Sequence, residues 1–264
     1  MHKILLELGA LKIYSYGFMA AMGFFFGFLL ALKKAKRDKL DEDSMYSLII
    51  IIVIMALVGG RVFYIILNWK DFLQNTSAYI LSREGFVFLG GFTFAAISAL
   101  SYTALKKLPV WRYADVFAPS IAFGHALGRL GCFLNGCCYG KVGHGFLAMV
   151  FPYDSVAGYY HPYEPVIATQ LISSLANFSI FVFLSLVYRN KKFDGQIFFL
   201  YFITYSIFRF IIEFIRGDYL QNQYYMFNLT ISQLTGIFLF FSGLIMYFYL
   251  KNKKQNENIS QMPA

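Results

Sequence analysis

Seven long apolar stretches dominate the chain, and each is long enough to cross a lipid bilayer. A transmembrane helix needs roughly 20 predominantly apolar residues to cross about 30 Å of hydrocarbon. Only 14% of the 264 residues are charged, whereas a soluble domain usually has about a quarter of its residues charged. The sequence therefore predicts an integral membrane protein. The stretches lie near residues 14–32, 46–68, 86–105, 113–135, 165–187, 196–216 and 230–250.

Clusters of basic residues mark one side of the predicted bundle. They follow the first, third, fifth and seventh stretches. Because cytoplasmic loops carry an excess of Lys and Arg, this side is predicted to be cytoplasmic, with the N-terminus outside and the C-terminus in the cytoplasm. The loops 69–84, 136–164 and 217–229 then face outward. The net charge of +9 is mostly such an orientation signal, so it does not indicate a nucleic-acid partner.

The sequence predicts a single all-α membrane domain of seven transmembrane helices over residues 1–250. Residues 251–264 are polar and are predicted to form a disordered cytoplasmic tail. The outer loop 136–164 is the longest loop, and its glycines and prolines argue against a continuous helix. With no soluble domain to carry a function, we expect the functional site within the bundle or at its outer face.

Ionisable residues occur inside the apolar stretches, where a charge costs at least a few kcal/mol. His125, Arg129 and Cys132 follow one another at i, i+4 and i+7 in the fourth stretch. This spacing places side chains on one stripe of a helix. The sixth stretch repeats it with Arg209, Glu213 and Arg216.

Two arginine-bearing stripes at similar depth favour an anion held between them, since the guanidinium group presents donors that match phosphate. A phospholipid headgroup is the anion most available there. Glu213 is expected to pair with Arg209 or Arg216 when no anion is bound. The alternative is a set of structural ion pairs, which explains Arg209 and Glu213 but leaves Arg129 and Arg61 without a carboxylate in their own stretches.

All three cysteines of the chain fall at the end of the fourth stretch. Four roles stay open: packed thiols, a disulfide on the oxidising outer face, a metal site with His125 as fourth ligand, and a catalytic thiol activated by Arg129. The spacing is not that of a zinc finger, and adjacent cysteines seldom bind one tetrahedral ion without strain. The three are Cys132, Cys137 and Cys138.

Residues 128–140 read GRLGCFLNGCCYG, which resembles the signature GRLGNFxNGExxG of the prolipoprotein diacylglyceryl transferase family. Residues 205–216 read YSIFRFIIEFIR and resemble a second family block, YGxxRFxxExxR. Shorter matches occur in the right order along nearly the whole chain. They are Tyr16-Gly17, Gly59-Gly60-Arg61, Asp115 to Pro119 and His161-Pro162.

The resemblance implies a transferase enzyme of the bacterial cytoplasmic membrane, with its active site toward the outer leaflet. The family moves the diacylglyceryl group of phosphatidylglycerol to the thiol of a lipobox cysteine in an exported prolipoprotein and releases glycerol phosphate. By resemblance, Arg129 and Arg209 hold the phosphate, and no metal or soluble cofactor is implied. The residues that would shape the headgroup pocket are Tyr16, Arg61, Asn135, Gly140, Tyr205, Glu213 and Arg216.

Three departures from the family pattern bear on the chemistry. Leu89 stands where the family has the histidine of an HGG motif, and Cys132 and Cys137 replace the asparagine and the glutamate of the signature. We expect His125, one turn before Arg129, to accept the thiol proton instead; the alternative is a packing histidine. Two other functions stay open: a transferase with a different acceptor, and a non-enzymatic transporter or a metal or redox sensor built on the cysteines.

Overall fold

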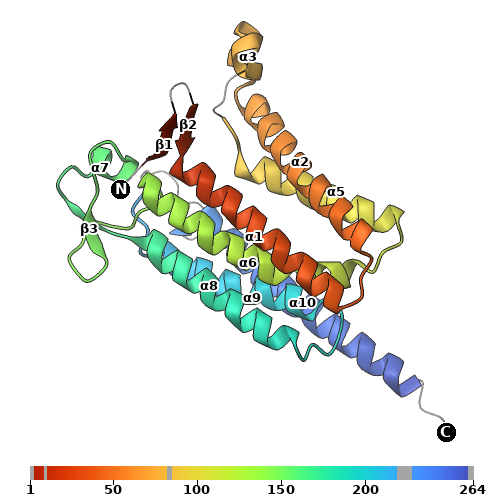
Figure 1. The fold of residues 1–264 in the computed structure, drawn as a ribbon. Coiled ribbons are helices and arrows are strands. Elements are labelled where there is room, and N and C mark those ends of the chain that lie inside the picture. The colour runs from red at the N-terminus through yellow and green to blue at the C-terminus, as the bar shows by residue number, and fades with distance from the viewer. Residues whose placement is uncertain (1–2, 9–10, 82–84, 219–227, 261–264) are drawn as a thin grey trace. The chain divides into compact units, whose positions relative to one another are not determined.

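A computed structural model describes residues 3–8, 11–81, 85–218 and 228–260 of the chain (Figure 1). Contacts group the chain into two compact units, which are described separately below. The larger unit comprises residues 1–31 and 114–264, and the smaller comprises residues 32–113. The single domain over residues 1–250 stays a prediction.

The smaller unit is built on one pair of helices. Glycines line the contact between them: a Cβ added to Gly59 would lie 2.5 Å from the Gly90 carbonyl oxygen, and one added to Gly91 would lie 2.7 Å from the Ala56 carbonyl oxygen. Small residues at such contacts let membrane helices approach backbone to backbone. The helices are α2 (Glu42–Leu67) and α5 (Phe88–Leu105), with the short α3 (Trp69–Gln74) and α4 (Thr76–Leu81) between them.

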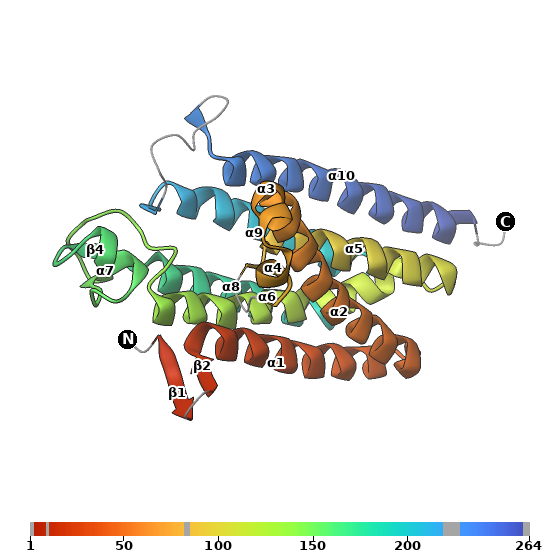
Figure 2. The same cartoon turned by 90° about the horizontal axis from the view of Figure 1, so that it is seen from above.

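In the larger unit, α1 and α6 lie side by side through the same kind of contact (Figure 1). A Cβ on Gly23 would lie 3.1 Å from the Gly124 carbonyl oxygen, and one on Gly27 would lie 3.2 Å from that of Ser120. The helices α8, α9 and α10 complete this unit, and α9 packs against both α8 and α10 (Figure 2). The bounds are α1 (Ser15–Arg37), α6 (Val110–Asn135), α8 (Thr169–Tyr188), α9 (Gln196–Glu213) and α10 (Ile231–Ser260).

A buried carboxylate fixes the start of α9 against α6. Asp115 accepts hydrogen bonds from the backbone N–H groups of Gly195 (2.9 Å), Ile197 (2.9 Å) and Phe198 (3.0 Å). The first N–H groups of a helix have no partner within it, and an acidic side chain there also interacts favourably with the helix dipole. Lys191, 3.5 Å from Asp115, balances the charge.

The prediction of an integral membrane protein is confirmed. Among the described residues, α1, α2, α5, α8, α9 and α10 are each long and apolar enough to cross a membrane. The helix α6 covers the predicted stretch 113–135 and is 26 residues long. It is not among these six helices, and it carries the ionisable residues Asp115, His125 and Arg129.

The structure adds small sheets to the predicted all-α architecture. Each is an antiparallel pair of strands. The segment 136–164 is no continuous helix, as predicted, and holds one short helix, α7 (Val156–Tyr160). Tyr139, Phe151 and Ala157 of this segment form a small apolar core with Val166. The sheets pair β1 (Ile4–Leu8) with β2 (Leu11–Tyr14) and β3 (Ala148–Val150) with β4 (Pro165–Ile167).

The C-terminal helix is longer than predicted. The segment 251–264 was expected to be disordered, yet α10 continues to Ser260. Residues 261–264 lie outside the described part of the chain, as do residues 219–227 of the predicted outer loop 217–229.

Candidate functional site

His125 of α6 is held by two tyrosines of α9. A hydrogen bond of 2.9 Å joins its Nδ1 to the hydroxyl of Tyr201, and its ring centroid lies 5.4 Å from that of Tyr205. Tyr205 was a predicted site residue, whereas Tyr201 was not. The only feature of the sequence that points to Tyr201 is its position one helical turn before Tyr205.

Arg129 lies one turn after His125 and faces no acid. Within the described residues, its guanidinium makes no hydrogen bond or ion pair with the protein. The ionisable groups in electrostatic range of it are the thiols of Cys138 and Cys132 and the hydroxyl of Tyr205, and the guanidinium of Arg216 is also in range. An uncompensated cation in a partly buried position is costly, so this group is suited to binding an anion.

The glycines beside Arg129 differ in their surroundings. A Cβ added to Gly131 would lie 3.3 Å from Tyr16 of α1, so this glycine lets the two helices approach. A Cβ added to Gly128 would meet no described heavy atom within 4 Å. Close packing therefore explains Gly131 but does not explain Gly128.

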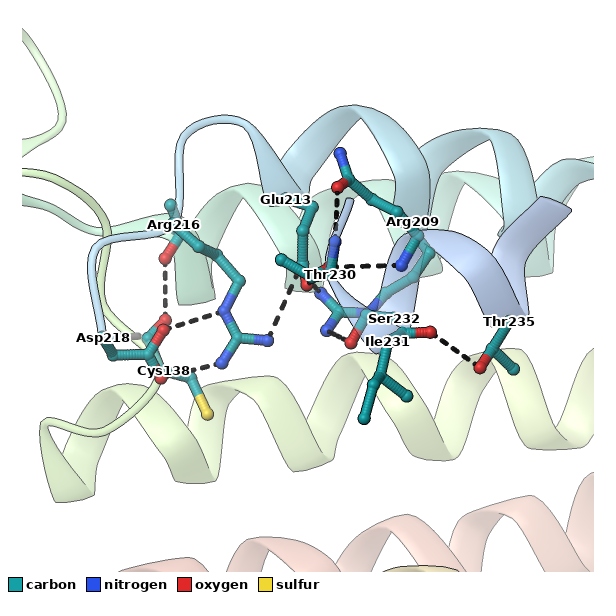
Figure 3. A network of polar contacts seen from close by, with 11 residues as sticks. Cys138, Arg209, Glu213, Arg216, Asp218, Thr230, Ile231, Ser232 and Thr235 are labelled. Atoms are coloured by element: carbon teal, nitrogen blue, oxygen red, sulfur yellow. Dashed lines mark hydrogen bonds and ion pairs between the residues drawn. The ribbon is translucent and has the colours of Figure 1, made fainter. Parts of the chain in front are cut away.

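Glu213 joins both arginines of the second predicted stripe (Figure 3). Its Oε2 lies 2.8 Å from Nη1 of Arg209 and 3.7 Å from Nη1 of Arg216, so both suggested pairings are present. The hydroxyl of Thr230 donates a 2.6 Å hydrogen bond to its Oε1, and Arg209 donates a 2.8 Å bond to Ser232. Thr230 and Ser232 flank the start of α10 and were not predicted.

The predicted helical spacing is wrong for Arg216. The helix α9 ends at Glu213, and Arg216 lies beyond it, where it forms an isolated antiparallel bridge with Gly140. The chain leaves the helix because the residues after it pair with the segment around Gly140. Asp218 holds the Arg216 guanidinium with two hydrogen bonds, of 2.9 and 2.7 Å (Figure 3). Asp218 was missed, although it lies only two residues from Arg216.

The three cysteines are brought together at the end of α6. Their sulfur atoms all lie within 4.8 Å of one another, and the thiols are free. Gly136 and Cys138 have positive φ angles of 71° and 63°, and this turn brings the two adjacent sulfurs near that of Cys132. Among the described residues, His125 is not part of the cluster, so the alternative of a Cys3His metal site is not what the structure brings together.

The cysteine turn is anchored to the start of α8. Thr169 donates a 2.7 Å hydrogen bond to the carbonyl of Cys138, and Gln170 donates one of 2.8 Å to that of Cys137. Gly140 fits closely beside Thr169: an added Cβ would lie 2.8 Å from the methyl group of Thr169. The turn is therefore fixed by contacts that leave its thiols available.

The three thiols are hydrogen-bonded to one another and lie near two arginines. Hydrogen bonds from the thiols of Cys132 and Cys137, together with the charges of Arg129 and Arg216, lower the pKa of the Cys138 thiol. Two more predicted residues border the cluster. They are Asn135, whose side chain interacts with Cys137, and Tyr16, which lies in range of the thiols and Arg129.

Arg61 belongs to the smaller unit. It donates a 3.1 Å hydrogen bond to the Gly85 carbonyl and another to the carbonyl of Tyr79. Its guanidinium lies over the rings of Tyr64 and Phe86, at 5.6 and 5.7 Å from their centroids. Backbone carbonyls and aromatic faces thus surround this arginine in its own unit.

The comparisons with known proteins agree with these motifs. A sequence model of prolipoprotein diacylglyceryl transferase matches residues 3–249. A phosphatidylglycerol–prolipoprotein diacylglyceryl transferase 2 from Clostridium perfringens (strain 13 / Type A) is 36% identical over 261 residues, which cover 97% of this chain and 98% of that protein. The corresponding transferase of Clostridium tetani (strain Massachusetts / E88) is 33% identical over 258 residues, covering 97% and 100%. The chain therefore belongs to the prolipoprotein diacylglyceryl transferase family of enzymes.

Proposed function

We propose that this protein transfers the diacylglyceryl group of phosphatidylglycerol to the thiol of a lipobox cysteine in an exported prolipoprotein and releases glycerol phosphate. The observation that carries the proposal is Arg129, a guanidinium beside Arg216 that meets no acid among the described residues. A lipid phosphate supplies the missing anion, and the relatives' names specify both substrates.

The reaction most needs stabilisation of negative charge at the phosphate. A thiolate attacks a primary carbon of the lipid, and the carbon–oxygen bond to phosphate breaks, so negative charge grows on the departing oxygen. Arg129 stabilises that charge, because preorganised donors are most effective where charge develops. Arg209 and Arg216, oriented by Glu213, complete the positive lining.

The space beside Gly128 supports a bound lipid. A Cβ at this position would have no described heavy atom within 4 Å, although glycine in a helix costs about 1 kcal/mol relative to alanine. Gly17, next to Tyr16, is open in the same way. Both positions belong to the motifs that resemble the family, and a lipid lying against them would account for the missing side chains.

We place the protein in the bacterial cytoplasmic membrane with α6 as a seventh span and the active site toward the outer leaflet. At about 1.5 Å per residue, the 26 residues of α6 reach about 39 Å, enough to span the hydrocarbon. The basic last turn of α1 supports a cytoplasmic position for that end and an outer position for the N-terminus.

The direct test incubates purified protein with phosphatidylglycerol and a lipobox peptide, and follows the peptide by mass spectrometry. We expect the peptide to gain one diacylglyceryl unit. Arg129→Lys should lower kcat/KM at least about 100-fold, because an ammonium cannot replace a two-point guanidinium contact. Arg189→Lys, at the exposed end of α8, is the matched control and should retain activity. An unmodified peptide with release of glycerol phosphate would indicate another acceptor.

His125 is the proposed proton acceptor, and its contact with Tyr201 makes this testable. His125→Ala should reduce transfer about 100-fold or more, as expected for loss of a general base. Tyr201→Phe removes only the hydrogen bond at Nδ1 and should have a smaller effect. Activity of His125→Ala near that of the unaltered protein would remove His125 from the mechanism.

A further inference from the structure

The three thiols at the end of α6 are arranged as ligands for one metal ion. Zinc–sulfur bonds are about 2.3 Å long, so sulfurs that share a tetrahedral ion lie about 3.8 Å apart. The sulfurs of Cys132, Cys137 and Cys138 lie within 4.8 Å of one another. Side-chain rotations that move each sulfur by roughly half an ångström to one ångström bring these distances to about 3.8 Å.

The backbone around the thiols is built for this convergence. Adjacent side chains normally diverge, but Cys138 adopts a left-handed conformation with φ of 63°. For a residue other than glycine this conformation is uncommon, and it persists only where its surroundings hold it. Thr169 and Gln170 supply that support through the carbonyls of Cys138 and Cys137. These contacts fix the backbone of the turn and leave the sulfurs free to converge.

The donor set selects the class of ion. Thiolates favour soft d10 cations such as Zn²⁺ and Cu⁺ and disfavour Mg²⁺ and Ca²⁺, which take oxygen ligands. Three thiolates carry up to three negative charges, and Arg129 lies in range of Cys138 to balance part of them. Arg216 lies beside Cys138 as well (Figure 3). Among the described residues, no fourth His, Cys, Asp or Glu joins the cluster.

Three protein ligands with a fourth position left open are characteristic of catalytic rather than structural zinc sites. We propose that Cys132, Cys137 and Cys138 hold a thiophilic d10 metal ion, with Zn²⁺ as the type, and that its open position binds the acceptor thiol as a thiolate. A metal deprotonates a coordinated thiol outright. This inference rests on the proposed function, because the ion would act on the acceptor of that reaction.

The position of the cluster suits this role. Cys132 and Cys138 lie in range of Arg129, which holds the lipid phosphate in the proposed function, so a thiolate on the ion would lie beside the phosphodiester. On coordination the thiol gives its proton to water, directly or through His125. The sulfur then forms a bond to the primary carbon as the carbon–oxygen bond breaks. The electron pair goes to the phosphate oxygen, the released glycerol phosphate takes up a proton from water, and the metal charge does not change.

Cobalt is the probe for the binding step. Reduced, chelator-treated full-length protein is titrated with Co²⁺, and one equivalent should produce thiolate-to-cobalt charge-transfer bands and the visible bands of a tetrahedral site, both abolished by Zn²⁺. The chain has only three cysteines, so these bands report on this cluster alone. The absence of charge-transfer bands would overturn the proposal.

Variants assign the ligands. Cys132→Ser, Cys137→Ser and Cys138→Ser should each weaken cobalt binding at least tenfold, whereas His144→Ala, at an exposed histidine of the outer loop, should not. If a serine variant does not fold, alkylation of the unaltered protein tests the same ligands. Bound Zn²⁺ should protect all three thiols from alkylation, counted by mass spectrometry. A disulfide in protein purified without reductant that prevents metal binding would contradict the proposal.

A peptide tests the open position separately. A lipobox peptide with one cysteine should shift the visible cobalt bands, whereas the same peptide with serine should not. No shift with the cysteine peptide would refute binding of the acceptor thiol. Equal lipid transfer by metal-free and zinc-loaded protein would refute the metal's role and leave the proposed function intact. A cobalt site that responds to the peptide but supports no lipid transfer would instead refute the proposed function.

Discussion

Replacing Glu213 with glutamine is expected to lower the free energy of unfolding by about 3–5 kcal/mol, the usual cost of removing one partner from a buried ion pair. The Glu213 side chain is 0% exposed, and those of Arg209 and Arg216 are 14% and 12% exposed. Water therefore screens these pairs poorly. Glutamine keeps the shape but removes the carboxylate 2.8 Å from Arg209, whereas Arg216 keeps Asp218 at 2.7 Å. Most of the loss should fall on Arg209.

The measurement is a titration with sodium dodecyl sulfate in mixed micelles, with helix content followed by circular dichroism. Thr230→Val is the comparison variant, since it leaves both ion pairs and removes the 2.6 Å hydrogen bond to Glu213 together with the 3.2 Å bond that Thr230 Oγ1 accepts from the Gln233 N–H. Loss of a hydrogen bond to a charged group costs about 1.5–3 kcal/mol. The expected order of stability is therefore unaltered protein, then Thr230→Val, then Glu213→Gln.

A double-mutant cycle isolates the ion pair from other effects of the substitution. Arg209→Gln combined with Glu213→Gln removes both charges. The loss of stability in the double variant should therefore be smaller than the sum of the two single losses, by at least about 1 kcal/mol. Additive losses would refute the coupling. A Glu213→Gln protein within about 0.5 kcal/mol of the unaltered one would refute the premise that this carboxylate balances buried cations.

Other substitutions test the supports of the site, each by the same titration. Asp115→Asn should destabilise the protein by about 3 kcal/mol, because a buried charge that holds three backbone N–H groups is lost. The control Asp194→Asn, at a carboxylate 49% exposed, should cost less than about 1 kcal/mol. Equal effects of the two substitutions would contradict the capping role of Asp115. Gly140→Ala should cost about 1–3 kcal/mol by overpacking against α8, while Gly145→Ala, with no heavy atom of the described residues within 4 Å, should be neutral. Gly90→Ala should cost a similar 1–3 kcal/mol, about as much as Gly140→Ala, by pushing α5 from a carbonyl oxygen 2.5 Å away; an unchanged midpoint would mean that the two helices do not pack this closely.

The membrane helices could be predicted from sequence because the lipid imposes their composition. Residues 86–105 were predicted where α5 covers Phe88–Leu105, and 46–68 where α2 covers Glu42–Leu67. Each needed only a local count of apolar residues. The end of α9 was not predictable in this way, because the apolar pattern continues through Ile215. What ends the helix is pairing with a segment more than 70 residues earlier, around Gly140.

The candidate site was predicted in its residues more than in its geometry. Helical spacing correctly placed His125 and Arg129 on one helix and paired Glu213 with Arg209. The convergence of the cysteines depends on the φ angle of Cys138, which adjacent cysteines in a sequence do not disclose. Asp218 was overlooked because an acid outside the apolar stretches looks like any surface residue.

The small core formed by Tyr139, Phe151, Ala157 and Val166 has a consequence for how the protein can vary. The chain leaves the signature at Gly140 and returns at Ile167, where a 2.8 Å hydrogen bond joins Gly140 N–H to the Ile167 carbonyl. Between these points Phe151 and Ala157 pack on Tyr139 and Val166. A segment with its own packing and neighbouring ends behaves as a cassette. Evolution or protein design can therefore lengthen, shorten or exchange the loops of this segment while the arginines and thiols outside it keep their places.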